Sequence, residues 1–244
     1  MRGLISLACL ALGAGSSSEA NPLPGAKAMA ATEVAAGDDQ HPVVVELFQS
    51  QDCSSCPPAN ANLNAIAGQK GVLALSFAVT YWDQLGWKDQ FAQPQYTQRQ
   101  WDYANGGGRG NVATPEVVVN GSGEMTGADK AHFARLVAVG GPKGSPTIGV
   151  DGGSMTVGAS KSDWPATVWL VRYDPRSRNV AIRAGENGGR TLPHRNIVTE
   201  LRALGRWTGA ATRFAVGPAA DKALLSAILV QRSNGGPILA ARKI

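Results

Sequence analysis

Two apolar runs dominate the hydrophobic pattern in the first half of the chain, Val43–Phe48 and Val72–Val79. Both runs are nearly continuous, which is typical of central strands whose two faces are covered. Between them, residues 59–68 carry apolar side chains at helical spacing and close on Gly68, a common helix stop. The pattern therefore predicts a parallel strand–helix–strand unit with a right-handed crossover.

Weaker patterns extend this unit to residue 142. We expect a polar helix at 96–104, a strand that begins with Thr114-Pro115, a short strand at 124–126 and a helix at 128–139. A proline fits only at the end of a strand because it lacks the N–H of the ladder. Asn120-Gly121 is a hairpin turn signal between the two strands. Residues 42–142 are thus predicted to form one α/β domain.

The hydrophobic pattern changes after residue 143. Short segments in which apolar and polar residues alternate are separated there by turn residues. The segments lie at 147–150, 154–157, 167–173, 180–184, 197–207, 212–216, 224–231 and 238–242. Strands at this spacing are typical of a β-sandwich, so we predict an all-β sandwich-like domain at residues 143–244. Residues 201–204 also fit a helical turn, but we favour the strand.

The N-terminal residues have the pattern of an export signal. Arg2 precedes a short apolar run at 4–12, and small residues follow up to Ala20, which predicts a signal peptide at residues 1–20. Residues 21–41 are rich in Ala, Gly and Pro and predict a linker. No run approaches the roughly 20 apolar residues of a membrane-spanning helix. We therefore expect a periplasmic or secreted protein that is not transmembrane after cleavage.

Composition narrows the class of function. The chain has 244 residues, 43% of them hydrophobic, and a formal net charge of +5. Its basic residues are scattered and form no stripe with aromatic residues, so no nucleic-acid partner is expected. The three cysteines are Cys9, inside the predicted signal peptide, and the pair Cys53 and Cys56.

Cys53 and Cys56 carry the main chemical hypothesis. They lie in the stretch Gln51–Pro58, between the first predicted strand and the following helix. A helix N-terminus favours a thiolate, and a disulfide that closes so small a loop stabilises a fold little. We therefore interpret the pair as a redox-active disulfide that needs no other cofactor. Cys53 is expected to be the attacking thiol at the exposed edge, and Cys56 the buried resolving thiol.

Other polar residues near the cysteines have a structural and a functional interpretation. Glu46 is a candidate proton shuttle for Cys56, or a salt-bridged residue near a strand end. Trp82 either walls a substrate groove beside the disulfide or caps the core. Residues 186–190 form a simple turn or dock against the cysteine face. A further set of charged residues is interpreted as surface ion pairs: Asp83, Lys88, Asp89 and Arg99.

The order of the predicted elements and two motifs resemble the thioredoxin family. The motifs are Cys-Ser-Ser-Cys-Pro-Pro at 53–58 and Thr114-Pro115 at the opening of a strand. The resemblance implies a thioredoxin-like domain at 42–142, with a cis proline that faces the cysteines. It also implies that Thr114 and Pro115 bind the substrate chain. With Trp82 as the groove wall, these residues form the predicted substrate site.

Longer stretches of the sequence resemble a more specific family. Over residues 42–210 the chain is similar to a family of secreted, thioredoxin-like bacterial proteins of uncharacterised function. The similar strings include VVELFQSQDCSSCPPANANLNAIA, LSFAVTYWDQLGWKDQFA, TPEVVVNG and GENGGRTLPHRNIVTELRALGRWTG. One departure is Ala78-Val79-Thr80, where His-Val-Asp is expected from the family. Any proton-transfer or metal-binding role of that His or Asp is therefore missing at Ala78 and Thr80.

These observations favour an exported thiol–disulfide oxidoreductase that exchanges the Cys53–Cys56 disulfide with protein or peptide thiols. A membrane redox partner is a further expected contact. The alternatives are a thioredoxin-like carrier of copper(I) or another metal, since thiolates are soft ligands, and a non-enzymatic envelope binding protein. The sequence does not set the direction of exchange, as oxidase, reductase or isomerase.

Overall fold

The computed structural model describes residues 38–142 and 146–244. The predicted signal peptide at 1–20 and all but the last residues of the predicted linker at 21–41 lie outside these ranges. The described residues form three helices: α1 (Pro57–Ile66), α2 (Pro94–Gly106) and α3 (Lys130–Val137). In this part of the chain no helix combines the length and the hydropathy that crossing a membrane requires.

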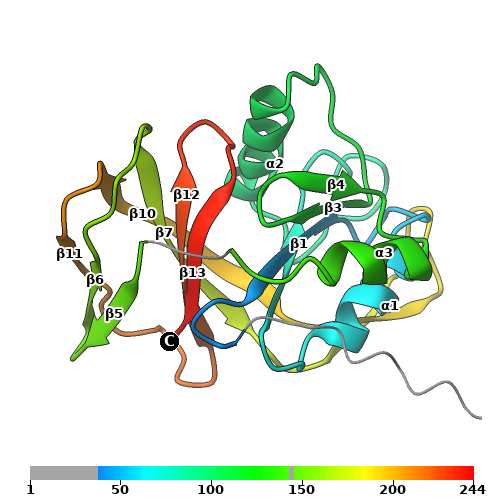
Figure 1. Ribbon diagram of the computed structural model, residues 1–244. Helices are drawn as coiled ribbons and strands as arrows, with labels where there is room; N and C mark the ends of the chain where they lie inside the picture. The colour runs from blue at the N-terminus through cyan, green and yellow to red at the C-terminus, as the bar shows by residue number, and fades with distance from the viewer. Residues whose placement is uncertain (1–37, 143–145) are drawn as a thin grey trace, which may run out of the picture. The chain divides into compact units, whose positions relative to one another are not determined.

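One large mixed sheet organises the described residues (Figure 1). Its eight strands lie side by side in the order β13 (Ile238–Lys243), β12 (Leu225–Arg232), β7 (Ala166–Asp174), β10 (Ile197–Trp207), β2 (Val72–Ala78), β1 (Val43–Gln49), β3 (Glu116–Val119) and β4 (Gly123–Met125). A smaller sheet contains β5 (Ile148–Asp151), β6 (Ser154–Val157) and β11 (Thr212–Ala215). The strands β8 (Arg178–Ala181) and β9 (Thr191–His194) form a separate pair.

The predicted fold class, a thioredoxin-like α/β domain followed by a β-sandwich, is wrong. Strands from both predicted parts belong to the same eight-stranded sheet. The join is a short parallel pairing of β10 with β2, in which Ile197 lies opposite Ser76. The Ser76 N–H donates to the Asn196 carbonyl over 2.9 Å. All the described residues belong to one compact unit.

Burial on both faces of the C-terminal strands explains why they do not form a separate sandwich. On β7, Val168 and Leu170 pack against β5 and β6, whereas Val171 and Tyr173 point into a second cluster with β1 and β2. A two-sheet sandwich would bury one face of each strand and leave the other to water. Here the second face is covered by the core of the N-terminal half.

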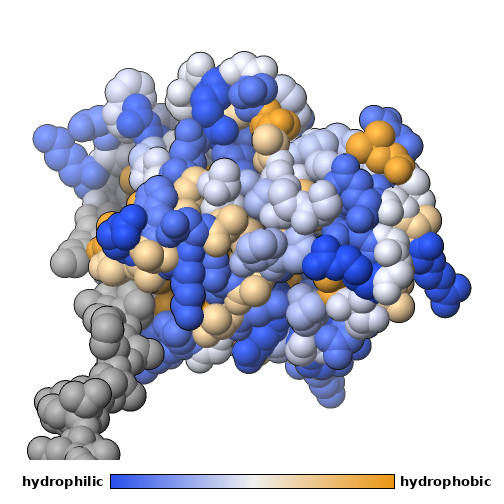
Figure 2. All heavy atoms as spheres, turned by 90° about the vertical axis from the view of Figure 1, so that its right-hand side faces the viewer, coloured by the Kyte–Doolittle hydropathy of each residue, from blue (hydrophilic) through white to orange (hydrophobic). Residues whose placement is uncertain are grey.

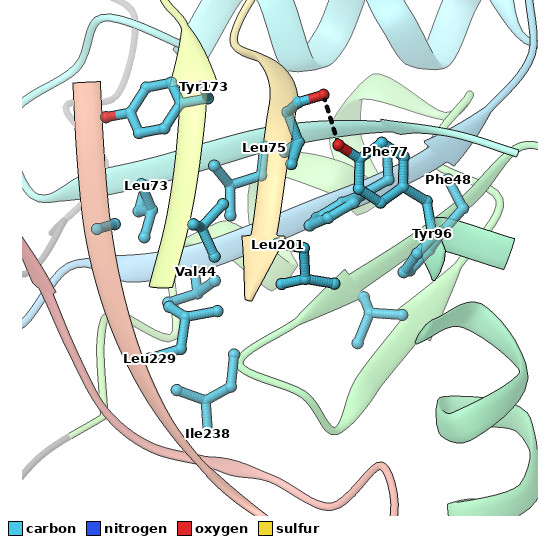
Figure 3. Packing of buried hydrophobic residues seen from close by; sticks show 14 of the residues in the cluster. Val44, Phe48, Leu73, Leu75, Phe77, Tyr96, Tyr173, Leu201, Leu229 and Ile238 are labelled. Carbon is cyan, nitrogen blue, oxygen red and sulfur yellow. Dashed lines mark hydrogen bonds between the residues drawn. The ribbon is translucent and has the colours of Figure 1, made fainter. Parts of the chain in front are cut away.

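This shared core joins the two halves of the large sheet. Figure 3 shows Val44 and Leu75 from β1 and β2 among Leu201 and Leu229 from β10 and β12. Tyr96 of α2 enters the same cluster, and its hydroxyl donates to the Val198 carbonyl over 3.1 Å. Burying apolar area yields about 25 cal/mol per Å², so this cluster contributes strongly to holding the halves together.

Helices cover the two faces of the N-terminal strands. Figure 1 shows α1, α2 and α3 beside these strands. Leu63 of α1 and Phe133 of α3 pack on one face of β1, β2 and β3, while Tyr96 and Tyr103 of α2 pack on the other. Because side chains alternate along a strand, the odd-numbered residues of β1 face α1 and the even-numbered ones face α2. Glu46 therefore points to the α2 face.

A buried ion pair fixes α2 to the sheet. The Arg99 guanidinium donates to both carboxylate oxygens of Glu46, over 2.7 and 3.1 Å, and to Gln231 of β12 over 3.1 Å. The Tyr103 hydroxyl also donates to Glu46. Burial alone would lower the pKa of Arg99, but the Glu46 carboxylate outweighs it and keeps the pKa raised. Arg99 thus links β1, α2 and β12.

Replacing Arg99 with alanine should destabilise the protein strongly. The substitution leaves the buried Glu46 carboxylate without its charged partner, and breaking such a pair costs about 3–5 kcal/mol. The free energy of unfolding in urea measures the effect. The matched control is Arg213→Ala, whose ion pair with Asp151 spans 3.5 Å with side chains 64% and 86% exposed and should contribute at most about 1 kcal/mol. Equal effects of the two substitutions would contradict this role of Arg99.

Candidate functional site

The cysteine loop, residues 50–56, connects β1 to α1. Cys53 and Cys56 form a disulfide across a Cα–Cα distance of 5.4 Å. Cys56 is the N-cap residue of α1, and the Cys56 N–H donates to the Cys53 carbonyl over 3.1 Å. The predicted strand–turn–helix context of the two cysteines is confirmed.

The loop lies at the surface, but its sulfur atoms do not. Cys53 and Cys56 are both 0% exposed, so the expectation that Cys53 occupies an exposed edge is wrong. Ser54 and Ser55, between them, are exposed. Figure 2 shows the face that carries α1 and α3, where hydrophilic residues predominate and hydrophobic ones are dispersed. Any thiol that reacts with this disulfide must therefore first gain access to it.

The start of α1 provides few backbone donors for a thiolate. Pro57 and Pro58 occupy the first helical positions and carry no N–H. The Ser55 hydroxyl is a nearer donor, because its Oγ lies 3.3 Å from Cys53 Sγ. The sequence motif alone suggested stabilisation by the helix N-terminus; the geometry adds a side-chain hydroxyl.

Thr114, one of the predicted substrate-binding residues, is hydrogen-bonded to the cysteine loop, and Trp82 is hydrogen-bonded to Thr114. The Thr114–Pro115 peptide bond is cis, as predicted. The Ser55 hydroxyl donates to the Thr114 carbonyl over 3.4 Å, and the Trp82 indole N–H donates to Thr114 Oγ1 over 2.8 Å. Trp82 also packs partly buried against the shared core. Cys53, Ser55, Thr114 and Trp82 thus form one connected group.

Glu46 does not join this group. Its carboxylate is 0% exposed and is occupied by Arg99 and Tyr103 on the α2 face. The proton-shuttle role of Glu46 stays a prediction that its contacts do not favour. At the site of the family departure, Ala78 is buried in β2, and the Thr80 N–H and hydroxyl pair with the Thr97 hydroxyl over 2.9 and 3.0 Å.

A buried carboxylate, Asp89 in the segment between β2 and α2, supports the cysteine loop. Asp89 Oδ2 accepts the Gln51 N–H over 2.8 Å, and Oδ1 accepts the Phe91 N–H over 2.8 Å. The Trp87 indole N–H donates to Gln51 Oε1 over 2.8 Å. Burial raises the pKa of Asp89 to about 6. The interpretation of Asp89 and Arg99 as surface ion-pair residues is wrong, since both are buried.

The segment 185–190, which we call the strap, lies between β8 and β9 and contacts the cysteine loop. The Asn187 side-chain amide donates to the carbonyls of Gln51 and Cys53, over 2.9 Å each. Glu186 Oε2 accepts the Ser54 N–H over 3.0 Å. Of the two interpretations of residues 186–190, docking against the cysteine face is therefore confirmed. The sequence contains no signal that singles out Asn187 within this turn.

Metal binding at the cysteines is the chemistry of the carrier alternative. Within residues 38–142 and 146–244, no three or more His, Cys, Asp or Glu side chains gather in a group that would hold a metal ion. The copper(I) alternative, which needs only the two sulfurs, stays a prediction that these contacts do not test.

The buried Asp89 should give stability a specific pH dependence. Its pKa rises from the ordinary value of 3.8 to about 6 in the folded protein, so between these values the folded state binds more protons than the unfolded state. The contribution of Asp89 to stability therefore falls as pH rises from about 4 to 6, by up to about 3 kcal/mol.

Comparison of wild type with Asp89→Asn isolates this contribution. The difference between their free energies of unfolding should decline from pH 4 to pH 6 and stay level above it. The control Asp163→Asn makes the same substitution at an exposed carboxylate, and the slope of Asp89→Asn is compared with it. A level difference for Asp89→Asn across the whole range would contradict the raised pKa.

The chain is similar to solved structures and matches a known protein family. Among solved structures, the chain is similar to protein AGR_C_4864 from Agrobacterium tumefaciens, with 27% identity and a TM-score of 0.66 over 83% of this chain and 93% of that one. HBP35 of Porphyromonas gingivalis shares the fold alone, with 15% identity and a TM-score of 0.53 over 85% of this chain and 76% of that one. No curated protein matches the chain. A family model described as "Protein of unknown function (DUF1223)" matches residues 44–231, most of the chain, so this protein belongs to the DUF1223 family.

Proposed function

We propose that this protein is an exported thiol–disulfide oxidoreductase that exchanges its Cys53–Cys56 disulfide with the thiols of proteins or peptides. The observation that carries the proposal is the disulfide itself, formed by two cysteines three positions apart at the start of a helix. The family description names no activity, so the secreted and thioredoxin-like character is part of this proposal. The proposal concerns the chemistry of the cysteines. It does not include the predicted two-domain fold, because strands from both predicted domains belong to one sheet.

The exchange is a pair of sulfur displacements. A partner thiolate attacks Cys53 Sγ, the Cys53–Cys56 bond breaks, and Cys56 leaves as a thiolate that takes up a proton. A second partner thiolate attacks the partner sulfur of the mixed disulfide and releases the Cys53 thiolate, which is protonated in turn. The pair gains two electrons and two protons, and the partner leaves with a disulfide. The reverse sequence reduces a partner disulfide.

The surroundings of Cys53 support this chemistry. The Ser55 hydroxyl, 3.3 Å from Cys53 Sγ, can turn from the Thr114 carbonyl to a sulfur anion, which is the stronger acceptor. Thr114, held by Trp82 and Ser55, offers an approaching peptide a fixed backbone beside the disulfide. No organic cofactor is needed, because the disulfide itself accepts both electrons from the partner thiols. The proposed partners are protein or peptide thiols and, for regeneration, a membrane redox partner.

An extracytoplasmic location is proposed with the activity. The residue pattern at 1–20 predicts a signal peptide, and disulfides persist in oxidising compartments. The protein would act in the periplasm or outside the cell.

Cys53→Ser should abolish exchange. Oxidised full-length protein is mixed with a fluorescent peptide that carries two thiols, and disulfide formation in the peptide is followed over time. Wild type should oxidise the peptide stoichiometrically, and repeatedly when a glutathione buffer regenerates the disulfide. Cys53→Ser and Cys56→Ser should show only the background rate. Ser54→Ala, a change in the same loop at an exposed residue, is the control and should retain activity.

The variants that lack Cys53 or Cys56 also distinguish the candidate functions. When the peptide is supplied in a disulfide-linked form, the Cys53 thiolate of reduced Cys56→Ser attacks that disulfide and releases a peptide thiol. The resulting mixed disulfide between Cys53 and the peptide should accumulate, visible by mass spectrometry, because the resolving thiol of the protein is missing. Equal rates for wild type and Cys53→Ser would sink the oxidoreductase and favour a non-enzymatic binding protein.

Removing the Ser55 hydroxyl should slow the chemistry of the reduced form. A hydrogen bond to a charged group contributes about 1.5 kcal/mol, which corresponds to about tenfold. Alkylation of reduced Cys53 by iodoacetamide at pH 7 should therefore be about tenfold slower in Ser55→Ala than in wild type. Ser54→Ala, whose side chain has no hydrogen bond to Cys53 among the described residues, should react at the wild-type rate. Equal rates for the two variants would remove Ser55 from the proposal.

A further inference from the structure

The strap contacts the cysteine loop through residue pairs that lie 132 to 136 positions apart in the sequence. Asn187 Nδ2 donates to the Gln51 carbonyl and to the Cys53 carbonyl, over 2.9 Å each. Asn187 is 0% exposed, and its Oδ1 accepts from the Arg190 guanidinium over 2.6 Å. Both donors and the acceptor of this amide are thus in use. Asn187 thus bridges two backbone carbonyls of the loop, that of Gln51 and that of the attacking cysteine, Cys53.

Neighbouring residues make the contact reciprocal. The Glu186 N–H donates to Asp52 Oδ1 over 2.7 Å, and the Glu186 carboxylate accepts the Ser54 N–H over 3.0 Å. Gly185 has φ +73° and lies so close to the loop that a Cβ there would overlap the Asp52 carboxylate. The strap is therefore seated against the loop on both sides of Cys53.

The closed arrangement leaves two buried polar atoms unsatisfied. Within the described ranges, Gln51 Nε2 and Asp52 Oδ2 are buried and have no hydrogen-bond partner. A buried donor or acceptor without a partner raises the free energy of the state that contains it. Release of the strap would let water reach both atoms. This cost opposes the hydrogen bonds of Asn187 and therefore lowers the free energy that release of the strap requires.

The strap also contains the backbone freedom that release requires. Gly185 and Gly189 have φ of +73° and +81°, and nothing lies within 4 Å of a Cβ built at Gly189. Glycine at such positions changes conformation at little steric cost. Glu186 is exposed, and segments with solvent-exposed hydrogen bonds open at low free energy. The contact can therefore open without unfolding the sheet.

We propose that Asn187 is a positioning residue that latches the cysteine loop closed, and that the strap must release before the Cys53–Cys56 disulfide can react. The inference rests on the proposed function and adds a step that regulates it, the release of the strap. It accounts for a reactive disulfide whose two sulfurs are both 0% exposed. A partner protein that displaces the strap gains access to Cys53, whereas a small thiol must wait for spontaneous opening.

Reduction by a small phosphine tests the latch without any partner protein. Tris(carboxyethyl)phosphine takes up oxygen from water as it converts the disulfide to two thiols, which are then counted by alkylation and mass spectrometry. The test compares oxidised full-length wild type with Asn187→Asp, which keeps the acceptor for Arg190 and removes both donors. Reduction should be at least about fivefold faster in Asn187→Asp, the factor that corresponds to one typical net hydrogen bond. In wild type, the rate should level off at high phosphine concentration because opening becomes limiting.

Two controls make the result specific. Asn179→Asp introduces the same charge on β8, at an exposed residue, and should be reduced at the wild-type rate. Glu186→Ala removes only the acceptor for the Ser54 N–H, and should accelerate reduction by a smaller factor. Because Glu186 is exposed, this variant also decides the question if circular dichroism shows that Asn187→Asp does not fold.

The outcomes distinguish the latch from the proposed function. A folded Asn187→Asp that is reduced at the wild-type rate, or a Glu186→Ala without acceleration where Asn187→Asp does not fold, overturns the latch. Faster phosphine reduction in the variants, together with no peptide oxidation by any form, supports the latch and sinks the oxidoreductase. Peptide oxidation by wild type, together with wild-type rates of phosphine reduction in Asn187→Asp and Glu186→Ala, supports the oxidoreductase and overturns the latch.

Discussion

Hydrogen bonds from one buried amide hold the candidate site together. A tight turn between a strand and a helix leaves backbone carbonyls without ladder partners, and buried carbonyls require partners. The carbonyl of Gln51 finds one in Asn187, and that of Cys53 finds one in Asn187 and in the Cys56 N–H. The disulfide and the two exposed serines thus lie in a loop whose carbonyls are bonded by a residue from a distant hairpin. The cysteine loop is complete only when residues 185–190 are in place.

The large sheet is what brings that hairpin to the loop. The β10–β2 pairing at Ile197 and Ser76 joins the two halves of the chain, and the Asn64 side chain of α1 donates to the Pro193 carbonyl of β9 over 3.0 Å. The core shared by β1, β2, β7, β10 and β12 then prevents the halves from separating. The C-terminal strands are therefore a structural part of the candidate site and not an independent module beside it.

Much of the secondary structure could be predicted from the sequence, but the pairing of the strands could not. The apolar runs at 43–48 and 72–79 and most of the later segments correspond to strands. Strand β9 was missed because Thr191–His194 is short and contains Pro193, which argues against a strand. The sandwich prediction failed because alternation shows that one face is buried without showing what covers the other. On β7 both faces are buried, one by a cluster that includes β1 and β2 and the other by a cluster that includes β5 and β6.

The candidate site was predictable where a local motif carries it. Cys53, Cys56 and the cis Thr114–Pro115 bond follow from short motifs, and Trp82 lies beside Thr114 as expected. Glu46 and Arg99 illustrate the limit, because charged residues are rarely buried unless paired, and the pairing joins β1 to α2 across 53 positions. Asn187 is a polar residue in a glycine-rich turn. Only the tertiary structure distinguishes it from an ordinary turn residue.

The reduction potential of the Cys53–Cys56 pair tests the central claim most directly. Folded full-length protein is equilibrated in glutathione buffers of graded ratio, and the dithiol fraction is counted by alkylation and mass spectrometry while circular dichroism monitors the fold. We predict reversible exchange between two folded forms, with a potential in the range of known exchange proteins, about −120 to −270 mV. A potential below about −300 mV, as for structural disulfides, or unfolding upon reduction, would contradict the proposed exchange.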